Sequence, residues 1–263
     1  MPLTTFKCEA GLVKIKDCFE ACPKGDRCLS LPTLHKIGAI KERIDGKFST
    51  TTLLKPTLQA YLEITCDYAV VPKERAFMLA GTDHHARLQA VANKLKEVKA
   101  ELPIHDFEVT STLDNLEPDE KAQGFYKLID YKLIGSYAVA KLLIGDYSGY
   151  DWQLNHYRVQ AERFGLPISR MFLQYTARDF TGKTAAMFKD KFTDAMALIP
   201  IPKYPDNEVI EYFDVRREAL EMALAHNETP PICDDRWGEN KCKKYCSVAS
   251  QCFHGKLYQG NTR

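Results

Sequence analysis

Two aspartates and a lysine in the middle of the chain have the spacing of a hydrolytic metal site. Asp130 and Lys132 lie two residues apart in the segment LIDYKLIG, and Asp114 lies upstream in STLDNLEPD. Residues at i and i+2 of a strand point to the same face, so the carboxylate and the ammonium should emerge side by side. Two carboxylates can hold Mg²⁺ or Mn²⁺ while the lysine orients or helps deprotonate a water, which suits hydrolysis of a phosphodiester.

Histidine and amide side chains on either side of this segment could complete the site. His84 and His85 follow Gly81, where we expect a helix to begin, and an imidazole beside two carboxylates suits Mn²⁺ as well as Mg²⁺. Gln153 and Tyr157 are four residues apart, hence on one helix face, and could contact phosphate or a terminal nucleotide. Each feature alone is usually structural, because an Asp-x-Lys pair is commonly a solvated ion pair. Their order along the chain favours the functional interpretation.

A second group of reactive side chains is formed by two cysteine blocks. Eight of the nine cysteines lie near the two ends, and both blocks contain the spacing Cys-x3-Cys-x5-Cys among polar neighbours. The N-terminal block holds Cys8, Cys18, Cys22 and Cys28, and the C-terminal block holds Cys233, Cys242, Cys246 and Cys252. This pattern favours thiolate metal sites over disulfides or buried thiols. Zinc and an iron–sulfur cluster both accept four thiolates, and the spacing leaves open whether each block closes its own site or the two ends share one.

The elements that must position these residues can be read from hydrophobic periodicity. Segments 107–116, 125–135 and 169–180 predict strands, and residues 151–167 predict a helix that ends at Gly165 and Pro167. A further helix is expected after the Ser49 cap, and another within 71–102, where Ala86, Leu88 and Val91 belong to an apolar stripe. The predicted fold class is α/β, with a mixed central β-sheet flanked by helices and cysteine-rich segments at both ends.

Composition limits the classes of function. The chain has 263 residues, of which 45% are hydrophobic, and a formal net charge of +1, which excludes a polycation that coats nucleic acid. No apolar run approaches the roughly 18 residues of a membrane span, and the first residues do not resemble a secretory signal, so we expect a cytoplasmic protein without membrane contact. The expected domains are a cysteine-rich segment over 1–48, a catalytic core over 49–215, and a C-terminal helix with a metal-binding segment over 216–263.

The order of the central motifs resembles the RecB-like branch of the PD-(D/E)XK nucleases over about residues 49–180. The motifs run from Gly-Thr-Asp-His-His (81–85) to Asp114, Asp130-Tyr-Lys132 and Gln153-Leu-Asn-His-Tyr157. The resemblance implies a nuclease core in which His85, Asp114 and Asp130 bind the metal and Lys132 is catalytic. It also implies that Gln153 and Tyr157 help to bind DNA. His85 matches the family position better than His84, because it lies four residues after Gly81.

Several relatives, among them the CRISPR-adaptation nucleases and AddB-type subunits, carry a [4Fe–4S] cluster held by one upstream cysteine and a C-terminal Cys-x2-Cys-x5-Cys. The present trio has x3 in place of x2, so zinc remains an alternative cofactor. The resemblance implies a deoxyribonuclease, with exonuclease action on single strands or duplex ends and a helicase or recombination partner. The alternative function is a catalytically inactive, metal-stabilised module that binds nucleic acid or recruits a partner.

Overall fold

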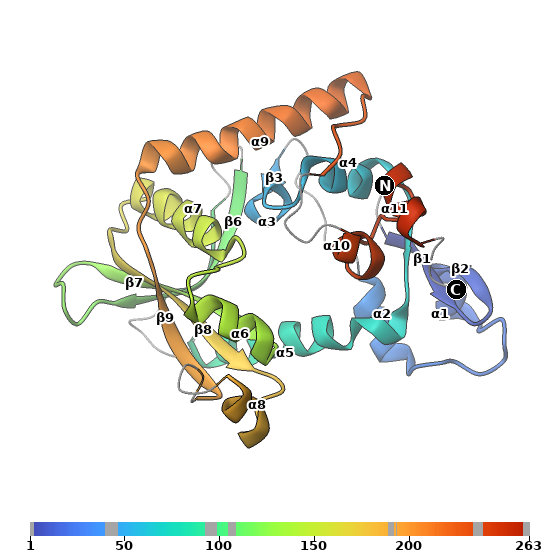
Figure 1. Ribbon diagram of the computed structural model, residues 1–263, viewed down its shortest axis with the longest axis horizontal. Coiled ribbons are helices and arrows are strands. Elements are labelled where there is room, and N and C mark those ends of the chain that lie inside the picture. The colour runs from blue at the N-terminus through green and yellow to red at the C-terminus, as the bar shows by residue number, and fades with distance from the viewer. Residues whose placement is uncertain are drawn as a thin grey trace. The chain divides into compact units, whose positions relative to one another are not determined.

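The computed structural model describes residues 3–39, 47–92, 99–104, 109–188, 192, 194–233 and 239–259. The chain forms two compact units, one of residues 1–45, 55–79 and 214–263, and a second of residues 46–54 and 80–213. Two helices, α5 (Ala76–Ala92) and α9 (Asp206–His226), run from one unit into the other. Each unit has its own mixed sheet, so the α/β fold with mixed sheets and flanking helices is confirmed (Figure 1).

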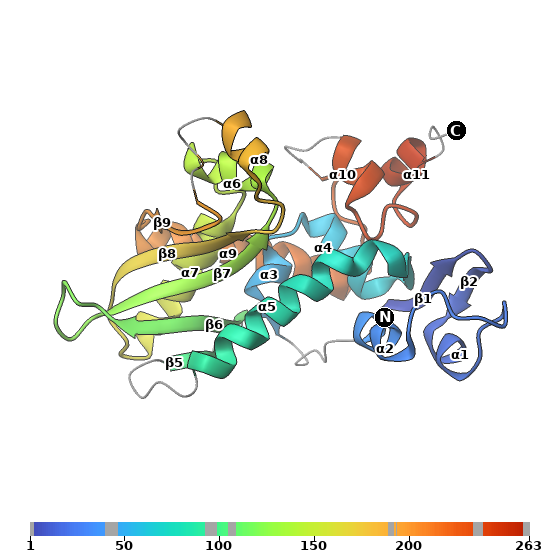
Figure 2. The ribbon, with the colours of Figure 1, turned by 90° about the horizontal axis from the view of Figure 1, so that it is seen from below.

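The second unit is built on a six-stranded sheet whose neighbouring strands run in the order β3-β6-β7-β8-β9, with β5 paired to β6 (Figure 2). Its strands are β3 (Phe48–Ser49), β5 (Lys99–Ile104), β6 (Val109–Pro118), β7 (Tyr126–Ile134), β8 (Ile168–Ala177) and β9 (Met196–Ile201). The helices are α3 (Thr50–Leu53), α6 (Ser136–Leu143), α7 (Tyr150–Arg163) and α8 (Gly182–Met187). Strands β7 and β8 are parallel, while β6 and β7 are antiparallel.

The predicted strands over 107–116, 125–135 and 169–180 are confirmed as β6, β7 and β8, and the predicted helix over 151–167 is α7. Leu113 and Leu128 of the sheet share one hydrophobic core with Leu154 of α7. Although α7 carries many polar residues, every side chain from 153 to 161 is buried. Several of their polar groups are hydrogen-bonded within the unit; for example, Gln160 donates to the carbonyl of Val109, although among the described residues Nε of Arg158 and Oε1 of Gln160 have no hydrogen-bond partner. Hydrogen bonds of this kind offset the free-energy cost of burying the polar side chains of a helix.

The helix expected after Ser49 is present, but it is divided in two. The Ser49 hydroxyl accepts a hydrogen bond from the N–H of Thr52 and caps α3, as predicted. The chain leaves this helix before Pro56, and α4 (Thr57–Thr65) follows. Proline lacks an N–H donor and its ring obstructs the preceding turn, so one continuous helix through this position is disfavoured.

The expectation that His84 and His85 open a helix was wrong, because both lie in the middle of α5. The expected apolar stripe was also misplaced, since Ala86 and Val91 are exposed; its further members Leu95 and Val98 lie outside the described residues. Leu88 and Ala92 instead share the inner face with His85, at spacings of three and seven residues. The less exposed face of α5 therefore carries His85, Leu88 and Ala92 in place of the predicted Ala86 and Val91.

The first unit contains a three-stranded sheet in the order β2-β1-β4. Its strands are β1 (Leu3–Cys8), β2 (Gly11–Lys14) and β4 (Tyr68–Val70). Its helices are α1 (Ile15–Glu20), α2 (Leu31–Gly38), α4, the 3₁₀ helix Pro72–Arg75, α10 (Glu239–Lys244) and α11 (Phe253–Gln259). The hairpin and helices among the N-terminal cysteines were not foreseen. Among the described helices, none combines the length and apolar character needed to cross a membrane.

Candidate active site

The site lies where strands β6 and β7 of the second unit stop pairing with each other. Their antiparallel register runs from Pro118 opposite Tyr126 to Asn115 opposite Ile129. Asp114 and Asp130 are the next residues along the two strands. Beyond the last pair, a side-chain contact replaces the backbone hydrogen bonds between the two strands. Oδ2 of Asp114 accepts a hydrogen bond of 3.0 Å from the N–H of Tyr131. This contact fixes the Asp114 carboxylate beside the segment that carries Asp130 and Lys132.

Asp130 and Lys132 form a buried ion pair between Oδ2 and Nζ, as their i, i+2 spacing suggested. The side chain of Asp130 is 2% exposed and that of Lys132 is 18% exposed. Burial tends to lower the pKa of Lys132, but the charges of Asp130 and Asp114 outweigh it, so that its pKa is raised. Lys132 is consequently an ammonium at neutral pH.

The two carboxylates titrate differently because their surroundings differ. Burial raises the pKa of Asp130 to about 6, with Lys132 opposing the shift and Asp114 adding to it. Burial would also raise the pKa of Asp114, but the hydrogen bond with His85, the charge of Lys132 and the Tyr131 N–H together hold it below its ordinary value. At neutral pH both groups are anionic, and Asp130 is the one that readily takes up a proton.

Helix α5 contributes His85 but not His84 to this group. The Nδ1 atom of His85 is 3.3 Å from Oδ2 of Asp114. His84 faces elsewhere in the unit, with its Nε2 atom 3.3 Å from the hydroxyl of Thr176. The geometry thus selects His85 of the two, which agrees with the four-residue separation from Gly81.

Helix α7 contributes a hydrogen bond to Asp130. The amide nitrogen of Gln153 is 3.3 Å from Oδ1 of Asp130 and 2.9 Å from the hydroxyl of Tyr157. Gln153 and Tyr157 are 6% and 5% exposed, so their contacts are with the carboxylate and with each other. Their expected role in DNA binding stays a prediction.

Tyr150 was missed by the sequence analysis. It is the first residue of α7, follows Gly149, and holds its ring 5.3 Å below the ammonium of Lys132, measured from ring centroid to Nζ. The N-cap glycine has φ +92°, a left-handed conformation that glycine adopts without strain. Tyr150 stands three residues before Gln153 and seven before Tyr157, so its helical spacing was the signal that could have identified it.

The donors at this site fit a hard divalent cation in type. His85 offers nitrogen, and Asp114 and Asp130 offer carboxylate oxygens, a combination suited to Mg²⁺ or Mn²⁺. The Nδ1 atom of His85 and Oδ2 of Asp114 are 3.3 Å apart and share a hydrogen bond, which a cation bound by both atoms would have to replace. Oδ2 of Asp130 is buried and accepts no hydrogen bond; its contact is the ion pair with Lys132. Within the described part of the chain, no three His, Cys, Asp or Glu side chains are already close enough to hold an ion.

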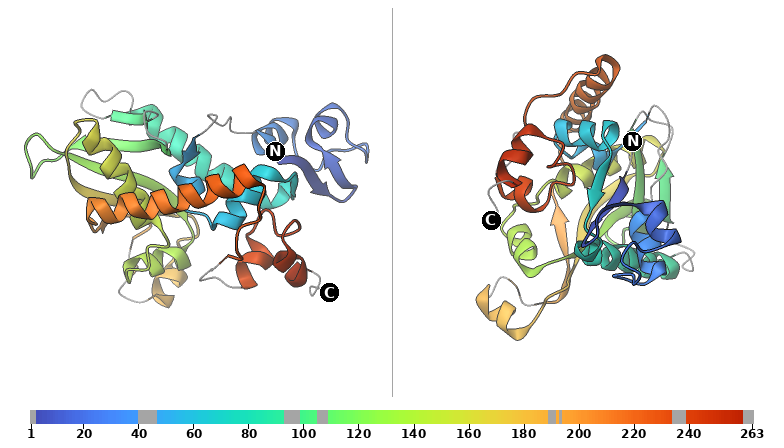
Figure 3. Two further views of the ribbon diagram at one scale, coloured as in Figure 1. Left: turned by 90° about the horizontal axis from the view of Figure 1, so that it is seen from above. Right: turned by 90° about the vertical axis from the view of Figure 1, so that its right-hand side faces the viewer.

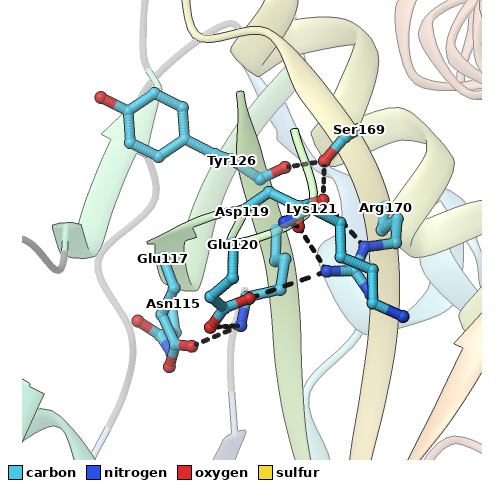
Figure 4. A network of polar contacts seen from close by, with 9 residues as sticks. Asn115, Glu117, Asp119, Glu120, Lys121, Tyr126, Ser169 and Arg170 are labelled. Carbon is cyan, nitrogen blue, oxygen red and sulfur yellow. Dashed lines mark hydrogen bonds and ion pairs between the residues drawn. The ribbon is translucent and has the colours of Figure 1, made fainter. Parts of the chain in front are cut away.

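A second polar network, also missed from sequence, lies at the hairpin end of β6 and β7 (Figure 4). Asp119 accepts hydrogen bonds from the Nε of Arg170 at 2.8 Å, from the Ser169 hydroxyl, and from the N–H of Lys121 at 2.9 Å. Arg170 holds the pKa of Asp119 well below its ordinary range. Because both carboxylate oxygens of Asp119 accept hydrogen bonds, we interpret this network as a structural clasp between the hairpin and β8 rather than as a binding site.

All nine cysteines are among the described residues, and none forms a disulfide. In the N-terminal block, Cys8 ends β1, Cys18 lies in α1, and Cys22 and Cys28 lie in the following loop. In the C-terminal block, Cys242 lies in α10, Cys246 and Cys252 lie between α10 and α11, and Cys233 precedes them. Metal binding by either block stays a prediction.

No family model and no curated protein matches the sequence. Nine chains of solved structures match the fold. One is described as the crystal structure of SSO0001; it is 12% identical, with a TM-score of 0.46, and the match covers 85% of this chain and 93% of that one. The chemistry of the site therefore rests on the residues described above.

Proposed function

We propose that this protein is a divalent-metal-dependent DNA nuclease that hydrolyses phosphodiester bonds. The observation that carries the proposal is the line of contacts through His85, Asp114, Asp130 and Lys132, which come from α5, β6 and β7. His85 lies 3.3 Å from Asp114, whose carboxylate also binds the backbone between Asp130 and Lys132. Three metal donors and a buried ammonium thus follow one another along a single line of contacts, which supports a role in phosphodiester hydrolysis.

His85, Asp114 and Asp130 would hold the cation. When bound, Mg²⁺ or Mn²⁺ supplies positive charge for the phosphate and lowers the pKa of water. The hydrogen bond from Gln153 to Oδ1 keeps the Asp130 carboxylate in one orientation. To bind a cation, the Asp130 carboxylate would have to replace part of its ion pair with Lys132 by a bond to the metal.

Lys132 acts as a hydrogen-bond donor rather than as a base. Its raised pKa keeps the amine protonated, so that it can orient the attacking water or a phosphate oxygen. The ring of Tyr150 lies against the ammonium and limits where it can point. The charge of Lys132 is therefore available where negative charge develops on the phosphate.

The substrate that we propose is DNA with an end, as a single strand or a duplex. The test incubates the purified full chain with linear and circular DNA of both kinds, in Mg²⁺ or Mn²⁺. We expect degradation of linear DNA, while the same DNA closed into a circle resists. Cutting of the circle would overturn the requirement for an end.

The matched variants are Lys132→Ala and Lys127→Ala. Loss of Lys132 should lower the cleavage rate by about 10²–10³-fold, as removal of one transition-state donor does. Lys127 lies on the same strand, but it pairs with Glu117 and Glu120, so its loss should leave the rate nearly unchanged. Full activity of Lys132→Ala would refute the site, and absence of cleavage by the unaltered protein with either metal would favour a non-catalytic binding module.

A further inference from the structure

The N-terminal lobe, defined as residues 3–39 together with β4, has a small hydrophobic core. Its buried members are Phe6, Ile15, Leu34, Ile37 and Val70. The loop from residue 21 to residue 30 contains turns but neither helix nor strand. Leu29 of this loop packs against the core, and small lobes commonly add a metal or a disulfide to packing of this extent.

The four N-terminal cysteines lie around this loop. Cys8 pairs with Gly11 at the end of the β1–β2 hairpin, Cys18 lies in α1, and the other two lie in the loop itself. The loop folds back at Cys22, whose Sγ is 3.0 Å from the carbonyl of residue 26. Cys28 is exposed and the other three are half-buried, with no disulfide among them. Cys18 packs against the hydrophobic core, whereas Cys28 is exposed and does not act as a core hydrophobe.

The two cysteine blocks lie on different elements of the first unit. In the N-terminal block, Lys24 of the loop forms an ion pair of 2.6 Å with Glu9, the neighbour of Cys8, so the loop lies beside the hairpin that carries Cys8. In the C-terminal block, Cys242, Cys246 and Cys252 lie in α10 and in the segment between α10 and α11. Both views of Figure 3 separate the blue N-terminal strands and helices from the red C-terminal helices of the same unit. The two blocks therefore do not share one set of ligands.

We propose that Cys8, Cys18, Cys22 and Cys28 bind one zinc ion as a four-thiolate site of their own, separate from the C-terminal block. Zinc accepts four thiolates in a tetrahedron, and a separation of three residues lies within the usual range of ligand spacings. Zn²⁺ has no redox chemistry, so a solvent-exposed ligand such as Cys28 is tolerated, whereas exposure alters the potential of an iron–sulfur cluster.

Two cations, Lys24 and Arg27, lie in the loop of the proposed site. Four thiolates around Zn²⁺ carry a net negative charge, and of these two cations Lys24 is paired with Glu9. Arg27 donates to the carbonyls of Phe19 and Glu20, which holds its guanidinium beside α1. Within the described residues no three of these thiols are close enough together to hold an ion, so zinc binding at this site requires the thiols to approach one another. Binding is thus coupled to a rearrangement of the lobe, with release of the thiol protons.

The test measures metal bound to the full chain, without DNA, and so does not depend on the proposed nuclease. Metal analysis of protein purified without oxygen should give zinc, and Cys22→Ser should lose about one zinc per chain. Cys66→Ser, which removes the cysteine outside both blocks, should lose none, and Cys246→Ser should keep the N-terminal zinc. Cys28→His should retain the metal, because imidazole is also a zinc ligand.

Alkylation of the unaltered protein provides a readout that does not require a variant to fold. We expect the four N-terminal cysteines to resist a thiol reagent until a chelator is added, as mapped by mass spectrometry. Their immediate modification would overturn the proposal, as would iron in place of zinc at this block. Equal loss of all metal from Cys22→Ser and Cys246→Ser would show a single shared site and overturn it too.

Discussion

Asp130 is the residue whose environment most directly suits cation binding. It is buried, it is held by Lys132 and Gln153, and its pKa is raised to about 6. Because the folded state holds this proton more tightly than the unfolded chain does, the contribution of Asp130 to stability is present at low pH and is lost as the pH rises through about 6. A cation reverses this preference, because it binds the ionised form.

The first prediction follows from that linkage. Carbon-13 NMR of side-chain carboxyls in the metal-free protein should show one aspartate that titrates near pH 6, and Asp130→Asn should remove this signal. Saturating Mg²⁺ should move the midpoint downward. A midpoint that is unchanged by Mg²⁺ would mean that the cation does not bind at this carboxylate.

Tyr150 is predicted to be a positioning residue for Lys132. Its ring lies 5.3 Å from the ammonium, and a desolvated cation–π contact is worth about 1–2 kcal/mol. Tyr150→Leu should therefore lower kcat by about tenfold with little change in KM, whereas Tyr150→Phe keeps the ring and should stay within about threefold. Tyr137→Leu is the control, because that exposed ring lies over Lys141. Equal activity of Tyr150→Leu and Tyr137→Leu would contradict the role.

At the scale of the elements, strands β6, β7 and β8 and helix α7 could be predicted from the sequence. Burial of one face of a strand or helix makes apolar residues recur at a regular spacing, and this spacing is visible in the sequence. The orientation of α5 did not, since His85 rather than Val91 turned inward. The N-terminal hairpin was missed because its four-residue strand β2 is too short to show a repeat. The contacts of Asp114 with His85 and with the backbone of β7 depend on where β6 and β7 stop pairing. The order of the motifs predicted which residues belong to the site, but not these contacts.

The clasp at the hairpin end should matter for stability and not for chemistry. Arg170→Ala leaves the carboxylate of Asp119 without its main partner, so we expect Tm to fall by several degrees at neutral pH. Since the pKa of Asp119 is lowered, this difference should persist at neutral pH and shrink in strong acid. Arg87→Ala, which removes an exposed ion pair with Asp83, should barely change Tm. Thermal unfolding with equal Tm values for the two variants would contradict the clasp.

At the scale of the whole molecule, two chemically distinct sets of metal donors occur in different units. Carboxylates and one histidine in the second unit suit a hard cation, and thiolates in the first suit zinc or iron. Cations bound by these two sets would therefore not compete for the same ligands. With a net charge of +1, the protein has little long-range attraction for DNA as a whole, so a substrate must be held by local contacts at the site.

The most direct test of the central claim is anomalous X-ray diffraction from crystals soaked in Mn²⁺. We predict a manganese peak bonded to His85, Asp114 and Asp130, at about 2.0–2.3 Å from their donor atoms, with Lys132 beside it. A peak elsewhere, or none at these residues when the soak saturates the protein, would contradict the account.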